Sequence, residues 1–511
     1  MNSAAAPART QRGAWLLAAA GGLLQTASFA PLDAWPLQIL GLALLVLALA
    51  GADARRAAAL GWLFGFAWLA SGLWWLFISM HDFGNIPAPL AALAVALLAA
   101  ALALYYALAA AAWARLRATG ARPSADAWLF AACWLLAELA RGLLLTGFPW
   151  IAGGYAHSNG PLAAWAPWIG VYGIGALAAW IAAALASAWQ QRQQRWNAVQ
   201  VAALPLLLAA LGHTLPGEFT RSTGSLSVSL LQPNVAQHLK FDAAQLERVL
   251  RWHRDALAAA RGTLVLTPES SLPLPLNLLD SQTLAALRAP FAQGERAALV
   301  GVFVGNDSQG YTNSVIGLSA GSDPARGAFY HYGKRHLLPF GEFIPPGFGW
   351  FVRAMAIPIG DQARGRSIEP LVVAGQRVRP LICYEDLFAE DIAASVVGVG
   401  AATVLANVTN LAWFGPAMVQ DQHLQFSRMR ALELQRPIVR ATNTGATAVI
   451  DHQGRVTARL APLVEGTLEA SVQGRTGATP YARWLAAWGL WPLALLGLAV
   501  LALAARGRHA P

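Results

Sequence analysis

The chain is poor in cysteine, lysine and charge. Two of its 511 residues are cysteine, Cys133 and Cys383, and Cys133 lies inside a long apolar run. Residues 222–475 therefore hold a single thiol, which excludes an internal disulfide there and a scaffold built on disulfides. Lys240 and Lys334 are the only lysines among 36 basic residues. Because arginine and alanine are abundant throughout, scarce lysine says little by itself. The position of Lys334 in the chain is the informative feature.

Charged residues make up 12% of the chain and hydrophobic residues 56%, which is far from a soluble average. The net charge of +10 does not indicate nucleic-acid binding, because much of the excess flanks apolar runs. These runs fill residues 1–213 and 484–505, whereas residues 222–475 have the mixed pattern of a globular domain. We expect a membrane domain at 1–221, a globular domain at 222–475, and a last span with a short tail at 476–511.

The apolar runs are long enough for about eight transmembrane helices, since a spanning helix needs roughly 20 apolar residues. The candidate spans are 13–30, 35–51, 57–79, 89–112, 125–145, 168–189, 196–213 and 484–505. The seventh is the weakest, because polar residues and a proline interrupt it. The first resembles a signal peptide, but further spans follow it at once.

Arginines set the expected orientation of these spans. With the N-terminus inside, the inside segments contain Arg9, Arg12, Arg55, Arg56, Arg115, Arg117, Arg122, Arg192, Arg195, Arg506 and Arg508. The short outside loops 31–34, 80–88 and 146–167 contain no lysine or arginine. Seven spans before residue 222 then place residues 222–475 outside the cytoplasmic membrane, on the periplasmic side.

Glu138 and Arg141 lie three residues apart in the fifth span, on one helical face. Charges in hydrocarbon are costly and often functional, so the pair is either a structural ion pair or a lipid-headgroup site. The following loop contains Trp150 in an apolar, aromatic segment. We expect this segment to lie at the membrane interface, as an aromatic anchor or as part of the lipid site.

Residues 222–475 alternate strand-like and helix-like segments, which indicates a layered α/β domain. The expected strands are 226–231, 263–266, 298–304, 378–382, 403–406, 438–441 and 447–450. The expected helices are 242–260, 281–292, 386–397 and 420–434. Glu269, Cys383 and Asn407 follow three of these strands, where active groups gather in such domains.

A thiol, an ammonium and a carboxylate are the groups that an acyl-transfer site needs: nucleophile, charge stabiliser and base. Cys383, Lys334 and Glu269 supply them. Taken singly, each has an ordinary alternative, as a small buried residue, a surface cation or a solvated acid. Their neighbours favour the chemical interpretation: Glu342 is the one acid in a rigid apolar loop, and Glu385 lies two residues beyond the thiol.

Three segments around these residues resemble the signature segments of the nitrilase superfamily. They are Pro-Glu-Ser (268–270), Lys-Arg-His-Leu-Leu-Pro-Phe-Gly-Glu-Phe-Ile-Pro (334–345) and Ile-Cys-Tyr-Glu-Asp (382–386). The resemblance implies an α-β-β-α sandwich in which Glu269 is the base, Lys334 stabilises the oxyanion and Cys383 is the nucleophile. It also implies that Glu342 and Glu385 are supporting acids.

Membrane spans on both sides of such a domain resemble the membrane-bound branch of that superfamily, the apolipoprotein N-acyltransferases. Further matching runs are 231–234, 407–415, 422–433, 436–445 and 474–484, with Gly-Phe-Pro-Trp (147–150) in the membrane half. The candidate substrate-binding residues are Gln232, Asn234, Trp413, Phe414, Phe340, Phe343, Trp150, Glu138 and Arg141. The chain departs from the family pattern at Thr267, Pro233, Phe241 and Leu411, none of them in the triad.

The resemblance implies transfer of an acyl chain from a membrane phospholipid, through a thioester on Cys383, to the α-amine of a diacylglyceryl-cysteine on an apolipoprotein. This is the last step of lipoprotein maturation in the bacterial inner membrane. We expect no metal and no organic cofactor, since the histidines show no zinc-ligand spacing with the lone thiol. We expect a monomer.

Two alternatives stay open. The first is a membrane-tethered amidase or nitrile hydrolase that uses the same triad on a soluble substrate, which predicts ammonia release without phospholipid. The second is a transporter or channel with an accessory domain, which predicts function without Cys383 and ionisable groups in several spans. Glu138 and Arg141 are the ionisable residues well inside a predicted span, which favours the enzyme.

Overall fold

The computed structural model describes residues 8–117, 123–190, 210–239, 243–345 and 361–507, with the single positions 203, 206, 207, 347 and 349. These residues form two compact units. The helical unit holds the chain up to Phe77, Pro87–Gly217 and the chain from Trp488 on. The sheet unit holds Glu218–Ala487 together with Ile78–Ile86. The domain limits expected at 221 and 475 stay a prediction, whereas the compact units divide at 217 and 487.

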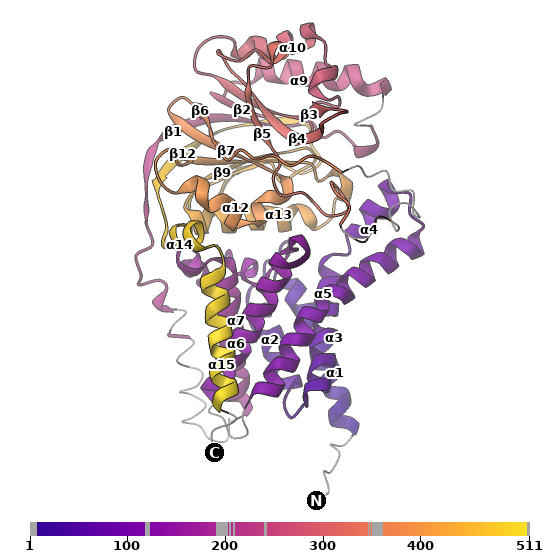
Figure 1. Ribbon diagram of the computed structural model, residues 1–511, viewed down its shortest axis with the longest axis vertical. Coiled ribbons are helices and arrows are strands. Elements are labelled where there is room, and N and C mark those ends of the chain that lie inside the picture. Colours follow the sequence, from indigo (N-terminus) through magenta and orange to yellow (C-terminus); the bar gives the residue numbers. More distant parts are fainter. Residues whose placement is uncertain are drawn as a thin grey trace, which may run out of the picture. The chain divides into compact units, whose positions relative to one another are not determined.

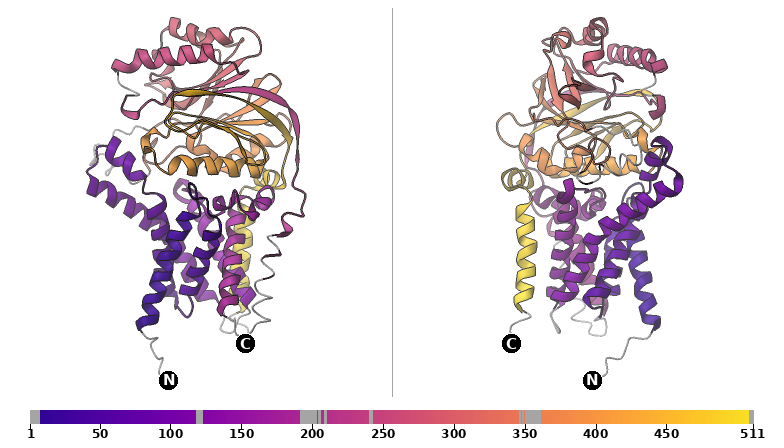
Figure 2. Two further views of the ribbon diagram at one scale, coloured as in Figure 1. Left: turned by 180° about the vertical axis from the view of Figure 1, so that it is seen from behind. Right: turned by 45° about the vertical axis from the view of Figure 1, so that its right-hand side comes forward.

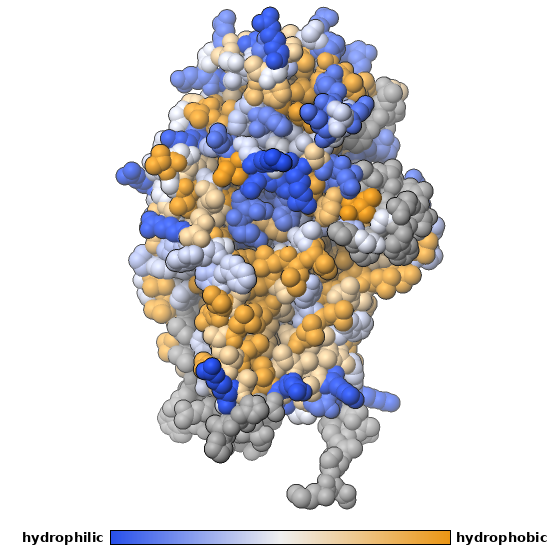
Figure 3. Space-filling view, in the orientation of Figure 1, coloured by the Kyte–Doolittle hydropathy of each residue, from blue (hydrophilic) through white to orange (hydrophobic). Residues whose placement is uncertain are grey.

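The helical unit is built from apolar helices that pack closely side by side (Figure 1). They are α1 (Ala8–Ala27), α2 (Pro36–Ala48), α3 (Ala54–Gly72), α5 (Ala88–Leu116), α6 (Pro123–Leu143), α7 (Ala166–Gln190) and α15 (Trp491–Gly507). Helices α3 and α5 approach closely because α3 carries glycine at the contact: a Cβ on Gly61 would lie 2.6 Å from the carbonyl oxygen of Tyr106. The visible face of this unit is mostly apolar (Figure 3).

By length and composition, three described helices could cross a membrane: Ala88–Leu116, Pro123–Thr146 and Pro161–Gln190. Two further spans arise if each bent pair counts as one. The first pair joins α3 to Leu76–Phe83, which comprises α4 (Leu76–Ile78) and η1 (Ser79–Phe83), at 60°. The second joins α14 (Pro480–Trp488) to α15 at 85°. The segments 57–79 and 484–505, which were expected as spans, thus each contain a bend.

The remaining expected spans meet the structure in different ways. The segment 35–51 forms α2, which has 13 residues and is short for a span. The segment 13–30 overlaps α1. Most of 196–213 lies outside the described residues. The count of eight spans therefore stays a prediction.

The sheet unit contains two six-stranded sheets. The first has the order β12 (Gly466–Gly477), β1 (Thr220–Gln232), β2 (Leu264–Leu266), β3 (Ala297–Asn306), β4 (Gly310–Leu318) and β5 (Tyr330–Gly333). The second has the order β11 (Val456–Arg459), β10 (Ala448–Ile450), β9 (Ile438–Thr442), β8 (Val404–Thr409), β7 (Gln376–Ile382) and β6 (Leu371–Val373). In each sheet the central strands pair in parallel and the outer ones antiparallel.

Side chains from both sheets share one buried core. Leu230 and Leu266 of the first sheet and Ile382 and Val408 of the second belong to it, each no more than 1% exposed. A second cluster packs α9 (Leu246–Ala259) and α10 (Ser281–Arg288) on the first sheet. Helix α13 (Val419–Leu434) contacts β9 and β10, and Figure 2 shows helices on the outer faces of both sheets. The site residues extend from strand ends that this core fixes.

All seven expected strands exist, but the sequence patterns missed β4, β5, β6, β11 and β12. Strand β8 runs on to Thr409, so Asn407 lies within the strand and does not follow it. The helix expected at 386–397 is broken into short turns around α12 (Ala389–Ala393). Short, polar or edge strands give weak alternation, which explains most of these differences.

Candidate active site

Cys383 lies where β7 ends and a short turn, η10 (Cys383–Leu387), begins. Its φ is 53°, in the left-handed region that residues with a side chain rarely adopt. Such strain persists where the surroundings fix it and is common at functional sites. The carbonyl oxygen of Cys383 accepts a hydrogen bond from Asn407 Nδ2 at 3.1 Å, which ties the turn to the neighbouring strand.

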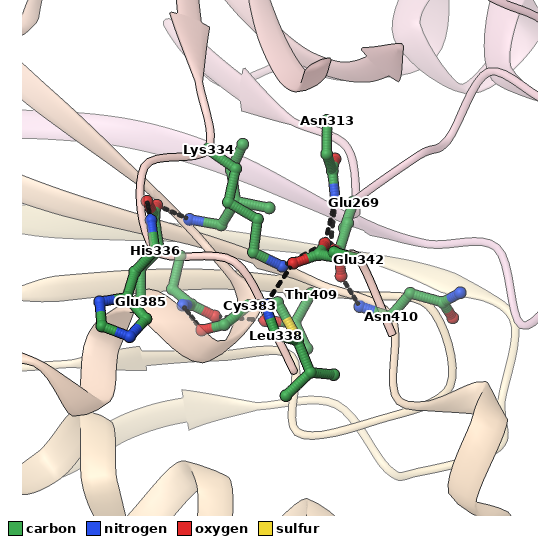
Figure 4. A network of polar contacts seen from close by, with 12 residues as sticks. Glu269, Asn313, Lys334, His336, Leu338, Glu342, Cys383, Glu385, Thr409 and Asn410 are labelled. Carbon is green, nitrogen blue, oxygen red and sulfur yellow. Dashed lines mark hydrogen bonds and ion pairs between the residues drawn. The ribbon is translucent and has the colours of Figure 1, made fainter. Parts of the chain in front are cut away.

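Lys334 directly follows β5 of the other sheet and is 1% exposed. Its Nζ lies 2.6 Å from Glu342 Oε1 and 3.3 Å from Glu269 Oε1. Figure 4 shows this ammonium, both carboxylates and the sulfur of Cys383 gathered at one place. The structure therefore brings together the thiol, the ammonium and the carboxylate that the sequence singled out.

Glu269 follows β2 and is held at both oxygens. Oε1 accepts from Asn313 Nδ2 at 2.7 Å and from Lys334, and Oε2 accepts from the backbone amide of Asn410 at 3.0 Å. Asn410 in turn donates its side-chain amide to Gln237 at 2.9 Å. These contacts leave the carboxylate little freedom, as a positioned base requires.

Glu342 is the second carboxylate on Lys334. Its Oε1 also accepts from Asn313 Nδ2 at 3.0 Å, and its Oε2 accepts from the backbone amide of Leu338 at 2.8 Å. Asn313 thus joins the two carboxylates through one amide group. The sequence interpretation missed Asn313, because it lies in β4, a strand that the pattern did not reveal.

Glu385 accepts four hydrogen bonds and joins the two sheets. Oε1 takes the backbone amides of Arg335 and His336 at 2.7 and 3.2 Å, and Oε2 takes Tyr332 Oη and the backbone amide of Ile382, both at 2.7 Å. The carboxylate therefore ties the segment after β5, which carries Lys334, to the turn that carries the thiol. Glu385 therefore acts by holding Lys334 and Cys383 in position.

Burial raises the pKa of the Cys383 thiol well above its usual value, and the Glu269 carboxylate adds to the rise, whereas Lys334 opposes it. Burial alone would lower the pKa of Lys334, but Glu342 and Glu269 more than offset it, so this pKa is raised. At neutral pH the cluster thus holds an ammonium and a protonated thiol. A base must remove the thiol proton before the sulfur can attack.

In the parts of the chain that the structure describes, no group of three or more His, Cys, Asp or Glu side chains could hold a metal ion.

Two family models match the chain. The model described as apolipoprotein N-acyltransferase N-terminal domain matches residues 21–184, and that described as carbon-nitrogen hydrolase matches residues 227–481. An apolipoprotein N-acyltransferase of Verminephrobacter eiseniae is 48% identical over 508 residues, covering 93% of each chain. One of Ralstonia nicotianae is 46% identical and covers 98% of this chain and 95% of that protein.

The chain belongs to the apolipoprotein N-acyltransferase family. Among solved structures, a CN-hydrolase superfamily protein of Xanthomonas campestris is 19% identical, with a TM-score of 0.37 over 52% of this chain and 96% of that one.

Three departures from the family pattern, Thr267, Leu411 and Pro233, are described by the structure and lie outside the cluster. Thr267 is fully buried, and its Oγ1 accepts from the backbone amide of Gly301 at 3.0 Å, so it joins β2 to β3. Leu411 is 1% exposed in the segment that precedes Trp413. Pro233 lines a small cavity that also contacts Glu269. Phe241 lies outside the described residues.

Gln232 and Asn234, expected to bind substrate, face the protein itself. Gln232 Nε2 donates to the carbonyl oxygens of Ala461 and Val464 at 2.8 and 2.6 Å, and Asn234 Nδ2 donates to that of Leu463 at 2.9 Å. They hold the loop between β11 and β12. Asn234 also has a φ of 50°, which asparagine tolerates better than most residues.

The aromatic candidates are more open. Trp413 is 40% exposed and Phe340 is 39% exposed, whereas Phe414 and Phe343 are half-buried. Trp413 also packs edge-to-face on Phe83 at 6.0 Å between ring centroids, so Ile78–Ile86 joins this unit through an aromatic contact. Exposed aromatic side chains of this kind suit contact with lipid.

Glu138, Arg141 and Trp150 lie inside the helical unit, each no more than 5% exposed. Arg141 Nη1 donates to the carbonyl oxygens of Phe148 and Trp150, both at 2.8 Å. Glu138 accepts from the backbone amide of Gly153 at 2.7 Å. The hydrogen bonds from Arg141 hold the Trp150 loop against the helices, and the place of this segment at the membrane interface stays a prediction.

Proposed function

We propose that this protein transfers an acyl chain from a membrane phospholipid to the α-amine of a diacylglyceryl-cysteine at the N-terminus of an apolipoprotein. The observation that carries the proposal is the convergence of Cys383, Lys334 and Glu269 from two sheets into one cluster, in which Lys334 and Glu269 are buried and Cys383 is half-buried. Family membership supports it, since relatives named apolipoprotein N-acyltransferase align over nearly the whole chain.

In the first half-reaction Glu269 accepts the proton of Cys383, and the thiolate attacks the ester carbonyl carbon of the phospholipid. The transfer leaves the net charge of the cluster unchanged, because a thiolate replaces a carboxylate beside the ammonium. Lys334 then stabilises the negative oxygen of the tetrahedral intermediate. As the intermediate collapses, the C–O bond breaks and Glu269 returns the proton to the departing lysophospholipid. A thioester remains on Cys383.

In the second half-reaction the acceptor amine attacks the thioester carbonyl. Glu269 takes a proton from the attacking nitrogen, the C–S bond breaks and the sulfur regains a proton. The products are the amide of the lipoprotein and the free thiol. An amine attacks a thioester readily. Exclusion of water from the site protects the thioester from hydrolysis until the acceptor arrives.

Glu342 and Glu385 support these steps without bonding to the substrate. Glu342 keeps Lys334 charged and aimed, through the 2.6 Å contact. Glu385 fixes the Lys334 segment against the thiol turn through its four hydrogen bonds. Neither role requires a metal or an organic cofactor.

We also propose the finer architecture that the family implies: about eight transmembrane helices and an α-β-β-α sandwich on the periplasmic side of the bacterial inner membrane. Arginines at the expected inside segments support this orientation. Within the helical unit, the start of α1 and the end of α15 lie at the same end, as an even number of spans requires (Figure 2). The protein acts as a monomer, with Trp413, Phe414, Phe340 and Phe343 contacting lipid.

Labelling of the thiol tests the function directly. Purified protein mixed with labelled phosphatidylethanolamine is expected to gain an acyl group that hydroxylamine removes, as a thioester does. Cys383→Ser should abolish the hydroxylamine-sensitive label, and Cys133→Ser, at the other cysteine, should retain it. Equal labelling of the Cys383→Ser and parent proteins would remove Cys383 as nucleophile.

The rival amidase reaction is tested in the same preparation. A nitrilase-type amidase would release ammonia from a soluble amide and would need no phospholipid. Ammonia release at a rate above acyl transfer would favour that reaction, and its absence, together with transfer of the label to a diacylglyceryl peptide, supports the acyltransferase.

A further inference from the structure

A second polar cluster surrounds the turn that begins at the thiol, and its residues come from η10, α13 and β9. It consists of Asp386, His423, Ser427 and Arg440, which are all 0% exposed, and we call it the rear cluster. Asp386 is in η10, three residues after the thiol, His423 and Ser427 are one turn apart on α13, and Arg440 is on β9. The mechanism proposed above uses none of them.

Asp386 is the centre of the rear cluster. Its Oδ1 lies 2.7 Å from His423 Nε2, and its Oδ2 accepts from Arg440 Nη1 at 3.1 Å and from the hydroxyl of Ser427. The positive charge of Arg440 compensates the negative charge of Asp386, as a buried carboxylate requires. The turn that begins at the thiol is therefore tied to α13 and to β9 at once.

His423 is held as a neutral ring with one defined tautomer. Arg440 Nη2, which can only donate, lies 3.3 Å from His423 Nδ1, so Nδ1 is the acceptor. The proton is therefore on Nε2, the nitrogen that faces Asp386. Burial lowers the pKa of His423, in agreement with a neutral ring.

The rear cluster reaches the nucleophile through its main chain. Asp386 is three residues after Cys383 in η10, so its contacts with His423, Ser427 and Arg440 anchor the turn that contains the nucleophile. Asn407 Nδ2 donates to the carbonyl oxygen of Cys383 itself at 3.1 Å. These contacts act on the residue whose φ is 53°. A strained conformation of this kind persists where neighbours over-determine it, and Asn407 and the rear cluster together are those neighbours.

We propose that His423 and Asp386 are positioning residues that hold the Cys383 main chain in its left-handed conformation and so aim the thiol at Glu269 and Lys334. This inference rests on the proposed function for its substrate and not for its geometry. A displacement of about 1 Å at a reacting atom costs up to about a hundredfold in rate, so loosening the turn should slow acylation without weakening lipid binding.

The chain offers a matched control on the same helix. Arg430 and Glu433 form another buried ion pair on α13, at 2.8 Å, with side chains no more than 1% exposed. Glu433→Gln therefore perturbs a buried polar contact of the same helix while leaving the rear cluster in place. A merely structural role of His423 predicts the same outcome for both sites.

The experiment uses the full-length protein in lipid nanodiscs, in a Cys133→Ala background so that Cys383 is the single thiol. The variants are His423→Leu, which removes the hydrogen bonds, His423→Gln, which keeps a donor near the place of Nε2, and Glu433→Gln. Single-turnover acylation is measured against phosphatidylethanolamine concentration, and the rate is divided by the number of thiols that iodoacetamide titrates in the folded protein.

We expect His423→Leu to acylate at least about tenfold more slowly, with the half-saturating lipid concentration unchanged. His423→Gln should recover most of the rate, and Glu433→Gln should match the parent even where its melting temperature falls as far. If His423→Leu does not fold, Ser427→Ala should show a smaller loss in the same direction. Parental acylation in His423→Leu or in a folded Ser427→Ala, no rescue by glutamine, or an equal loss in Glu433→Gln would overturn the proposal.

Failure of the proposed function gives a different result. If the parent takes no acyl group from phospholipid, the role of the rear cluster is tested by the rate at which iodoacetamide alkylates Cys383. The proposal then predicts a changed rate in His423→Leu, a parental rate in Glu433→Gln, and it fails if both variants behave as the parent.

Discussion

Lys334 lies closer to Glu342 than to Glu269: its Nζ is 2.6 Å from Glu342 Oε1 and 3.3 Å from Glu269 Oε1. The ammonium is therefore shared unequally, and the weaker contact is the one to the proposed base. A base fully paired with the ammonium would be a poor proton acceptor, because an adjacent cation favours the charged carboxylate. Glu342 holds the ammonium and leaves Glu269 able to accept a proton.

Glu342→Gln is predicted to slow acylation about tenfold to a thousandfold. Without its charge, Lys334 moves toward Glu269 and weakens the base. Glu342→Asp keeps the charge and should lose less. The measurement is the rate of hydroxylamine-sensitive labelling in one turnover, and a Glu342→Gln rate equal to the parent rate would exclude this division of roles.

Asn313→Ala is predicted to slow acylation about tenfold, since each carboxylate loses a hydrogen bond worth about 1.5–3 kcal/mol and is free to turn. Ser314→Ala is the matched control: the neighbouring side chain is buried on β4, and its hydroxyl bonds to the Thr312 carbonyl oxygen and not to the cluster. Labelling and melting temperature are measured for both. Equal losses in the two variants would mean that the strand, and not the amide, is responsible.

Glu269→Gln is predicted to abolish acylation and yet to speed alkylation of Cys383 by iodoacetamide. Burial and the Glu269 charge raise the thiol pKa, so at pH 8 the parent thiol is mostly protonated and alkylation rises only as pH increases further. Removing the charge lowers this pKa while Lys334 remains, so more thiolate is present at pH 8. Alkylation is followed from pH 6 to 10 in a Cys133→Ala background. Slower alkylation in Glu269→Gln would contradict the charge relationship.

Trp413→Ala is predicted to raise the half-saturating phospholipid concentration about tenfold. Gln232→Ala should leave this concentration unchanged and should lower the free energy of unfolding by about 1–3 kcal/mol. The tryptophan is exposed and the glutamine holds two loop carbonyls. Leu278→Ala, at a side chain that is 60% exposed on η7 (Leu276–Leu278), is the control for loss of an exposed apolar group. An unchanged Trp413→Ala would remove this residue from the lipid site.

Much of the site could be predicted from the sequence, because its chemistry is carried by rare residues in distinct local patterns. Cys383 and Glu269 follow apolar runs that indeed form β7 and β2, and Lys334 follows β5, a strand too short for its pattern to reveal. Asn313 and the rear cluster were not predicted, because an isolated polar residue in a strand or helix has no local signature of its partner.

The partners of Gln232 and Asn234 could not be predicted from the sequence. A matching sequence run suggested that they bind substrate, but their amides are used on the loop at 461–464. A hydrogen-bonding side chain looks the same in sequence whether its partner is a ligand or a backbone carbonyl more than two hundred residues away. The direction of the side chain decides, and that direction comes from the pairing of β1 with β12.

By itself, the sequence determined the division into apolar helices and an α/β domain, and the order Glu269, Lys334, Cys383, since periodicity and rare residue types are local properties of the chain. The tertiary structure alone decided that Lys334 is shared between two carboxylates, that two helix pairs are bent, and that Arg141 draws the Trp150 loop inward. These features depend on which distant segments pack together, and the free energy of burying charges and polar groups selects that packing.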